Sequence, residues 1–173
     1  MTPTDRTALK QFYLELWQDN CLRHPLTEPR LVASPKPFNL TKTNDLERAI
    51  CRWFELKGYK AERVKVQGRL IGSDVVTYNT ITGKRQTIDK AKYVPSTGAK
   101  GTADISITCR NKEGAVMSLR IEVKNGYTND RVRQDQIKYK QQHEAAGGTY
   151  IVIHYFSEFI EWANQNVLLT TKS

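Results

Sequence analysis

The stretch that decides the fold is residues 101–126, which read GTADISITCRNKEGAVMSLRIEVKNG. Apolar and polar residues alternate over 103–110 and again over 117–124, the period of a β-strand with one buried face. Between these two runs, the residues Asn-Lys-Glu-Gly at 111–114 have the composition of a turn. The stretch therefore predicts an antiparallel hairpin with one apolar and one polar face.

The polar face of this hairpin carries an unusual set of charges. A turn centred between Lys112 and Glu113 pairs residues whose numbers sum to about 225, so Asp104 and Glu122 face each other within one residue. Lys124 follows Glu122 by two positions and shares its face. Two carboxylates and a lysine are groups that bind Mg²⁺ and orient water beside a phosphate. The alternative is an exposed cross-strand ladder of salt bridges, which needs no ligand.

Outward from the hairpin, helix and strand signals follow one another. Four segments have the apolar period of amphipathic helices: residues 5–22, 44–58, 131–146 and 157–166. Residues 150–155 are apolar on both faces, which predicts a central buried strand, and short strands are expected within 60–87. This order predicts an α/β fold in which a central mixed sheet is flanked by helices and preceded by an N-terminal helical extension.

The first 43 residues are expected to stand apart from the rest. Four prolines between His24 and Thr43 break any regular element, so a Pro-rich connector follows the first helix. We expect one unit over 1–43 and the main domain over 44–173. The apolar face of the first helix should dock on the main domain or on a second subunit, which makes a homodimer a candidate arrangement.

The composition of the whole chain limits the classes of partner that we expect. The 173 residues include 27 Lys and Arg against 18 Asp and Glu, a net charge of +9 that favours a polyanion such as nucleic acid. With no long apolar run and no signal-peptide pattern, we expect a cytoplasmic protein of a bacterial or phage-infected cell, without a membrane partner. The three cysteines and three histidines lack the spacings of disulfide or zinc sites, so a bound metal should be a hard ion held by carboxylates. The absence of a P-loop sequence argues against a nucleotide cofactor.

Four short motifs, in this order, resemble those of the PD-(D/E)XK nuclease superfamily: Gly101–Asp104, Ile121–Gly126, Asp135–Gln136 and Ala145–Val152. Within the superfamily the chain is most similar to the VRR-NUC family, which occurs as a stand-alone module in phages and mobile elements. The ten residues between Gln136 and Gly147 are similar to the spacing in that family. The resemblance covers roughly residues 44–165, and the basic insertion at 70–100 is longer than the family leads us to expect.

The resemblance implies a restriction-endonuclease-like core and a metal-dependent DNA endonuclease. Asp104 and Glu122 would be metal ligands, joined by the backbone carbonyl of Val123, and Lys124 would be the catalytic lysine. Gln136 would position the lysine or the attacking water from a neighbouring helix. The implied cofactor is Mg²⁺, with Mn²⁺ able to substitute.

Two of the implied residues have a competing interpretation. Glu47 matches an acidic residue on the first helix of the superfamily that approaches the metal through water, but it also fits a capping box with Asn44 as N-cap. Gln136 could lie on a solvated helix face. That interpretation is weakened because the residues in its stripe look mostly buried: Val132, Gln136, Tyr139, His143 and Ala146.

The resemblance favours cleavage of branched DNA, such as a Holliday junction or a flap. Two alternatives remain open: a non-catalytic DNA-binding or regulatory module of a repair, replication or defence assembly, and a sequence-specific restriction-type enzyme that reads bases through residues 60–100. Basic residues are candidates for contacts to the DNA backbone, against the simpler interpretation of solvated charge: Lys84, Arg85, Lys100, Arg131, Arg133 and Lys138.

Overall fold

Four helices and eight strands form the fold in a computed structural model that describes residues 1–64, 69–71, 75–78, 80–83, 85–89, 92–94, 101–128 and 130–169. In chain order they are α1 (Pro3–Arg23), the 3-10 turn η1 (Pro29–Leu31), α2 (Thr43–Leu56), β1 (Ala61–Arg63), β2 (Arg69–Ile71), β3 (Val75–Tyr78), β4 (Arg85–Asp89), β5 (Lys92–Val94), β6 (Ile105–Arg110), β7 (Val116–Val123), α3 (Gln134–Ala145), β8 (Thr149–Ile153) and α4 (Phe156–Asn166).

The central sheet has the strand order β1-β6-β7-β8 and is mixed, as the sequence predicts. β6 runs antiparallel to β1 and β7, whereas β7 and β8 are parallel. Ile105 pairs with Ile121, a register that places Asp104 and Glu122 at opposing positions and confirms the predicted hairpin. The prediction that residues 150–155 form a central strand is wrong: among the described strands β8 pairs with β7 alone and lies at the sheet edge.

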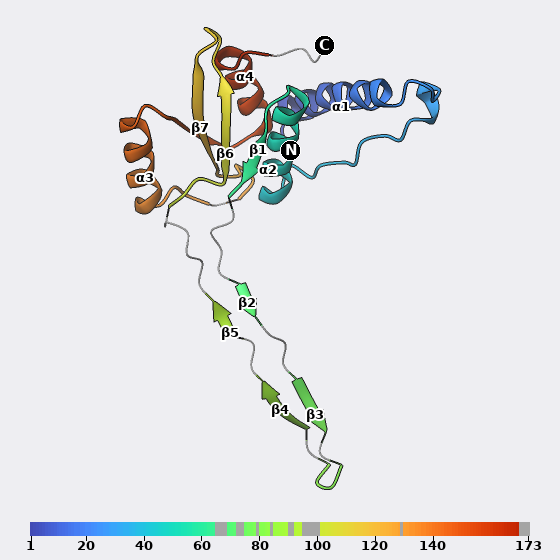
Figure 1. Cartoon of the computed structure of the whole chain (residues 1–173), viewed down its shortest axis with the longest axis vertical. Helices are drawn as coiled ribbons and strands as arrows, with labels where there is room; N and C mark the ends of the chain where they lie inside the picture. Colours follow the sequence, from blue (N-terminus) through green and yellow to red (C-terminus); the bar gives the residue numbers. More distant parts are fainter. Residues whose placement is uncertain are drawn as a thin grey trace.

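The apolar face of the hairpin packs against helices α1, α2 and α4, with α3 on the opposite side of the sheet (Figure 1). Ile105, Ile107 and Ile121 are buried together with residues of α2 and α4. Contacts of α3 and α4 with β8 explain the apolar character of this edge strand. The core thus lies between the sheet and the helices α1, α2 and α4.

Helix α1 is part of the same core. Thr2 caps it by accepting a hydrogen bond from the backbone N–H of Asp5, and Leu9, Phe12 and Leu16 are buried in the shared apolar cluster. The first helix therefore docks on its own chain. The apolar face that we considered for a homodimer is used inside the molecule.

Two short antiparallel ladders, β2–β5 and β3–β4, lie between β1 and β6 in the sequence. Figure 1 shows them following one another away from the four-stranded sheet, and we call them the arm. β2 and β3 confirm the short strands expected within 60–87, whereas β4 extends beyond that range and β5 was not expected. Within the described part of the chain, no helix has the length and apolarity needed to cross a bilayer.

All three cysteines, Cys21, Cys51 and Cys109, are free, as predicted. Burial raises the pKa of Cys51 and of Cys109 to about 11. These two thiols are therefore protonated and unreactive at neutral pH.

Candidate active site

The site begins where the hairpin strands separate. Asp104 directly precedes β6, and its Oδ2 accepts a hydrogen bond of 2.8 Å from the backbone N–H of Val123. This bond continues the β6–β7 ladder beyond its last backbone pair, with a side chain as the acceptor. The N–H and C=O of one strand residue point to the same side. The carbonyl of Val123 therefore faces the same side as the Asp104 carboxylate.

Glu122 and Lys124 extend from β7 into this end of the sheet, and both are buried, with relative exposures of 1% and 5%. The Nζ of Lys124 lies 2.9 Å from Glu122 Oε1 and 3.2 Å from Asp130 Oδ2. An exposed ladder of salt bridges is thus excluded for this triplet. Asp130, which the sequence did not single out, is the second carboxylate held by the lysine.

Gln136 joins helix α3 to Glu122. Its Oε1 accepts a hydrogen bond of 2.8 Å from the backbone N–H of Arg133, which fixes the amide so that Nε2 donates to Glu122 Oε1. This contact sets the start of α3 at Gln134, three residues later than predicted. The predicted buried stripe is only partly right: Gln136, Tyr139 and His143 are half-buried, but no residue of α3 is fully buried.

These groups line an open pocket of about 370 Å³. Its walls come from the start of α2, both hairpin strands, the loop after β7 and the start of α3: Thr43, Asn44, Glu47, Asp104, Glu122, Val123, Lys124, Asp130, Arg133 and Gln136. Two larger hollows of about 550 and 450 Å³ lie beside α1 and the connector, and neither has a pair of neighbouring acids like Asp104 and Glu122 among its lining residues.

Burial and like charge dominate the electrostatics of the pocket. Burial, together with the charge of Asp104, raises the pKa of Glu122 to about 7, and burial also raises the pKa of Asp104. Burial acts to lower the pKa of Lys124, but Glu122 and Asp130 outweigh it and raise that pKa. The lysine is therefore charged at neutral pH, and the two carboxylates favour a further cation.

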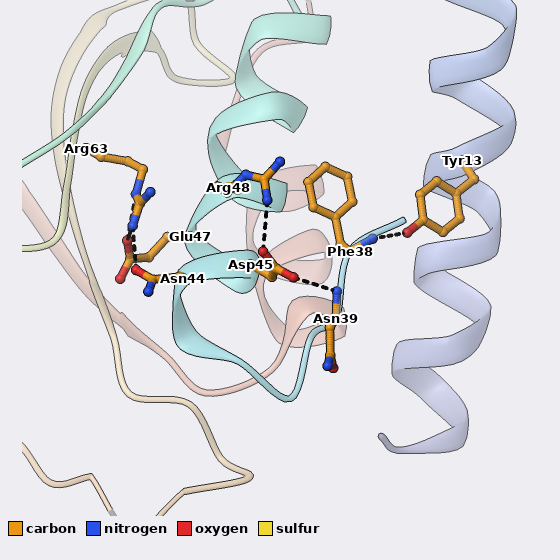
Figure 2. A network of polar contacts seen from close by, with 8 residues as sticks. All are labelled: Tyr13, Phe38, Asn39, Asn44, Asp45, Glu47, Arg48 and Arg63. Carbon is orange, nitrogen blue, oxygen red and sulfur yellow. Dashed lines mark hydrogen bonds and ion pairs between the residues drawn. The ribbon is translucent and has the colours of Figure 1, made fainter. Parts of the chain in front are cut away.

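Glu47 lines the pocket but is held by a residue that the sequence did not reveal. Arg63 of β1 donates from Nε to Glu47 Oε2 at 2.7 Å and from Nη2 to the same oxygen, and Nη2 also reaches Asn44 Oδ1 at 2.8 Å (Figure 2). The predicted capping box is wrong, because α2 starts at Thr43 with Lys42 as N-cap and no side-chain cap. Asn44 lies inside the helix and shares the arginine with Glu47.

The loop that follows Lys124 is anchored by the N-terminal segment. Asn125 is fully buried and donates from Nδ2 to the carbonyl of Leu40 at 3.0 Å. The hydroxyl of Tyr127 donates to Asp5 Oδ2 at 2.7 Å, and Asp5 Oδ1 accepts from the backbone N–H of Ser157 at 2.8 Å. Residues 1–43 thus support the loop that carries Asp130.

The donor set fits one kind of metal ion. Among the described residues, no three His, Cys, Asp or Glu side chains gather into a group that could hold a metal ion by themselves. Asp104, Glu122 and the Val123 carbonyl offer oxygen ligands only. One or two carboxylates with waters and substrate oxygens are the usual ligands of Mg²⁺.

Of the six candidate DNA contacts, the structure describes the side chains of three, Arg131, Arg133 and Lys138. Lys84 and Lys100 lie outside the described residues, and Arg85 is described by its backbone in β4. Arg131 and Arg133 precede α3 rather than lying in it, and of these two only Arg133 lines the pocket. Lys138 is exposed on α3.

In comparisons with known proteins, the chain matches no protein family model and no curated protein sequence.

Proposed function

We propose that this chain is a metal-dependent DNA endonuclease with a PD-(D/E)XK core, most similar to the VRR-NUC family. One observation carries the proposal: Asp104, Glu122 and Lys124 converge with the Val123 carbonyl on one open pocket, although Glu122 and Lys124 are buried, Asp104 is half-buried, and charges are costly to bury. Such a group of perturbed charges in a pocket is a feature of functional sites. A purely structural role would be served better by apolar side chains.

In this proposal each residue has a defined task. Asp104, Glu122 and the Val123 carbonyl would hold Mg²⁺ or Mn²⁺, and Glu47, whose carboxylate Arg63 fixes, would approach the ion through water. When bound, the ion supplies Lewis acidity towards the phosphodiester oxygens. The ammonium of Lys124 orients the attacking water and stabilises the charge that develops on the phosphate. Gln136 keeps the Glu122 carboxylate aimed at the pocket, and hydrolysis leaves a 5′-phosphate.

Branched DNA is the proposed substrate. Neither a base-reading motif nor a base-sized apolar slot is evident at the described pocket, whose walls are almost entirely polar. Recognition would then rest on phosphate positions and DNA shape, which carry no base sequence by themselves. A resolvase that cuts two strands would act as a homodimer through a surface other than the apolar face of α1.

Cleavage assays test the proposal. Labelled linear duplex, flap and four-way junction are incubated with the full chain in Mg²⁺ or EDTA, beside Lys124→Ala and Asp104→Asn. We expect cleavage in Mg²⁺ alone, fastest on a branched substrate, and at least about 100-fold slower in either variant. Lys112→Ala and Glu113→Gln, in the exposed turn of the same hairpin, are matched controls that should cleave as the wild type does.

The same assay separates the alternatives. DNA binding without cleavage by the wild type would indicate the non-catalytic module, provided that Mg²⁺ does not shift the melting temperature. Cleavage at fixed sequences of linear duplex would indicate a restriction-type enzyme. Equal cleavage by the wild type and both site variants would reject the assigned residues.

A further inference from the structure

The two ladders of the arm, β2–β5 and β3–β4, are both antiparallel and have the same register. In β2–β5, Arg69 pairs with Val94, and in β3–β4, Tyr78 pairs with Arg85. The residue numbers of both pairs add up to the same value, so the two ladders have the same register relative to the turn at 80–83. One register irregularity lies within β3–β4, between Val75 and Val76. Each ladder is a two-stranded antiparallel ribbon, and Figure 1 shows the two following one another.

Both roots of the arm rest on residues of the candidate active site. Val64, directly after β1, donates its N–H to the carbonyl of Asp104 at 2.7 Å. Gly101 has a φ of +80°, and a Cβ there would lie 2.8 Å from the backbone N of Gln136, so only glycine fits this close approach. The chain thus leaves the body of the molecule at Val64, beside Asp104, and returns to it at Gly101, beside the start of α3.

The arm region is also where the positive charge of the chain concentrates. Residues 65–100 hold seven Lys and Arg against two Asp, so more than half of the net charge of +9 comes from about a fifth of the chain. Basic residues occur in three of its four strands: Arg69 in β2, Arg85 in β4 and Lys92 in β5.

We propose that the arm is a duplex-binding element that lies along the DNA on one side of the scissile phosphate. The major groove admits a two-stranded ribbon, and Lys and Arg neutralise its flanking phosphates. The nine residue steps from Arg69 to Tyr78 reach at most ~30 Å at 3.3 Å per residue, the length of about nine base pairs. The position relative to the cut rests on the proposed nuclease function, whereas duplex binding by the arm does not.

A binding experiment in EDTA tests the arm without requiring cleavage. The Kd for a labelled 30-base-pair duplex is measured against salt for the wild type, for Arg69→Gln/Arg85→Gln/Lys92→Gln, and for a control that loses three exposed charges of the body, Lys10→Gln/Lys36→Gln/Lys112→Gln. For the arm variant we expect about tenfold weaker binding at 0.1 M salt and a salt slope smaller by about 2 to 3. An equal loss in both variants would overturn the proposal, as would equally tight wild-type binding to single strands or acidic vesicles.

A short-turn variant tests the reach of the arm. Residues 70–93 are replaced by Asn-Gly, which suits a two-residue turn because Arg69 and Val94 are already register partners. We expect the wild type to have at least a fivefold lower KM for a 30-base-pair than for a 12-base-pair substrate, and the variant to lose this preference for the longer substrate. Retention of the length preference would contradict the arm proposal while leaving the nuclease proposal intact. If the wild type binds duplex through the arm but never cleaves it, the nuclease proposal is rejected and the arm proposal stands.

Discussion

We expect the buried carboxylates of Asp104 and Glu122 to lower the stability of the protein at neutral pH. They share the end of one hairpin, Glu122 is 1% exposed, and the pKa of Glu122 is raised to about 7. A carboxyl group whose pKa is higher in the folded than in the unfolded state costs stability once the pH exceeds its unfolded value. Without metal, wild-type stability should therefore fall as the pH rises from about 4.3 through 7.

The variant Asp104→Asn should be more stable than the wild type in EDTA at pH 8, by about 1 kcal/mol. The asparagine carbonyl can still accept the hydrogen bond from Val123, while the charge that opposes Glu122 is gone. At pH 5 Glu122 is protonated in the wild type, so the gain should shrink. Urea unfolding at pH 5 and pH 8 measures the difference in stability. The exposed control Glu113→Gln should leave the stability unchanged at both pH values. A variant that is less stable at pH 8 would contradict the assigned charge repulsion.

Gln136 links the fold to the chemistry through one amide. We expect Gln136→Ala to weaken Mg²⁺ binding severalfold and lower kcat about tenfold, because Glu122 loses the donor that orients it. The free energy of unfolding should also fall by about 1 kcal/mol, because the backbone N–H of Arg133 loses its acceptor, the Gln136 side chain, at the start of α3. Calorimetric Mg²⁺ titration and single-turnover kinetics measure both effects. Gln142→Ala on the exposed side of α3 is the matched control. An equal effect of Gln142→Ala would mean that the loss of Mg²⁺ binding and activity comes from a general weakening of α3 and not from the bond to Glu122.

At the scale of elements, α1 is structural rather than an attachment. Phe12 is 2% exposed and its ring stacks near Phe38 and Phe156, which come from the connector and from α4. We expect Phe12→Ala to lower the free energy of unfolding by about 3 to 5 kcal/mol. Leu14→Ala on the same helix, at 48% exposure, should cost less than about 0.5 kcal/mol. Similar small costs for both would indicate that α1 does not share the core.

The sequence predicts elements whose signals are local. The alternation on either side of a four-residue turn is enough for the β6–β7 pairing, and with it the opposition of Asp104 and Glu122. The edge position of β8 could not be predicted, because a strand covered by helices on both faces has the same apolar pattern as a central strand.

Contacts between distant segments leave no period in the sequence. Arg63 holds Glu47 across 16 positions, and Tyr127 reaches Asp5 across 122, so neither pairing has a sequence spacing that signals it. Asp130 stands beside Lys124 only through the path of the intervening loop. The candidate ligands could thus be named from the sequence, whereas most of the side chains that hold them in place could not.

At the scale of the whole molecule, α1, α2, the sheet and α4 should unfold in one transition, because they bury one apolar cluster. Cys21 near the end of α1 offers a selective probe: it is half-buried, whereas Cys51 and Cys109 are buried thiols with a pKa of about 11. A maleimide fluorophore on Cys21 and far-UV circular dichroism should report the same urea midpoint. Phe12→Ala should shift both midpoints together. An earlier transition at Cys21 would mean that residues 1–43 form a separate unit and that the contacts of Asp5 and Leu40 with the loop after β7 are lost before the core unfolds.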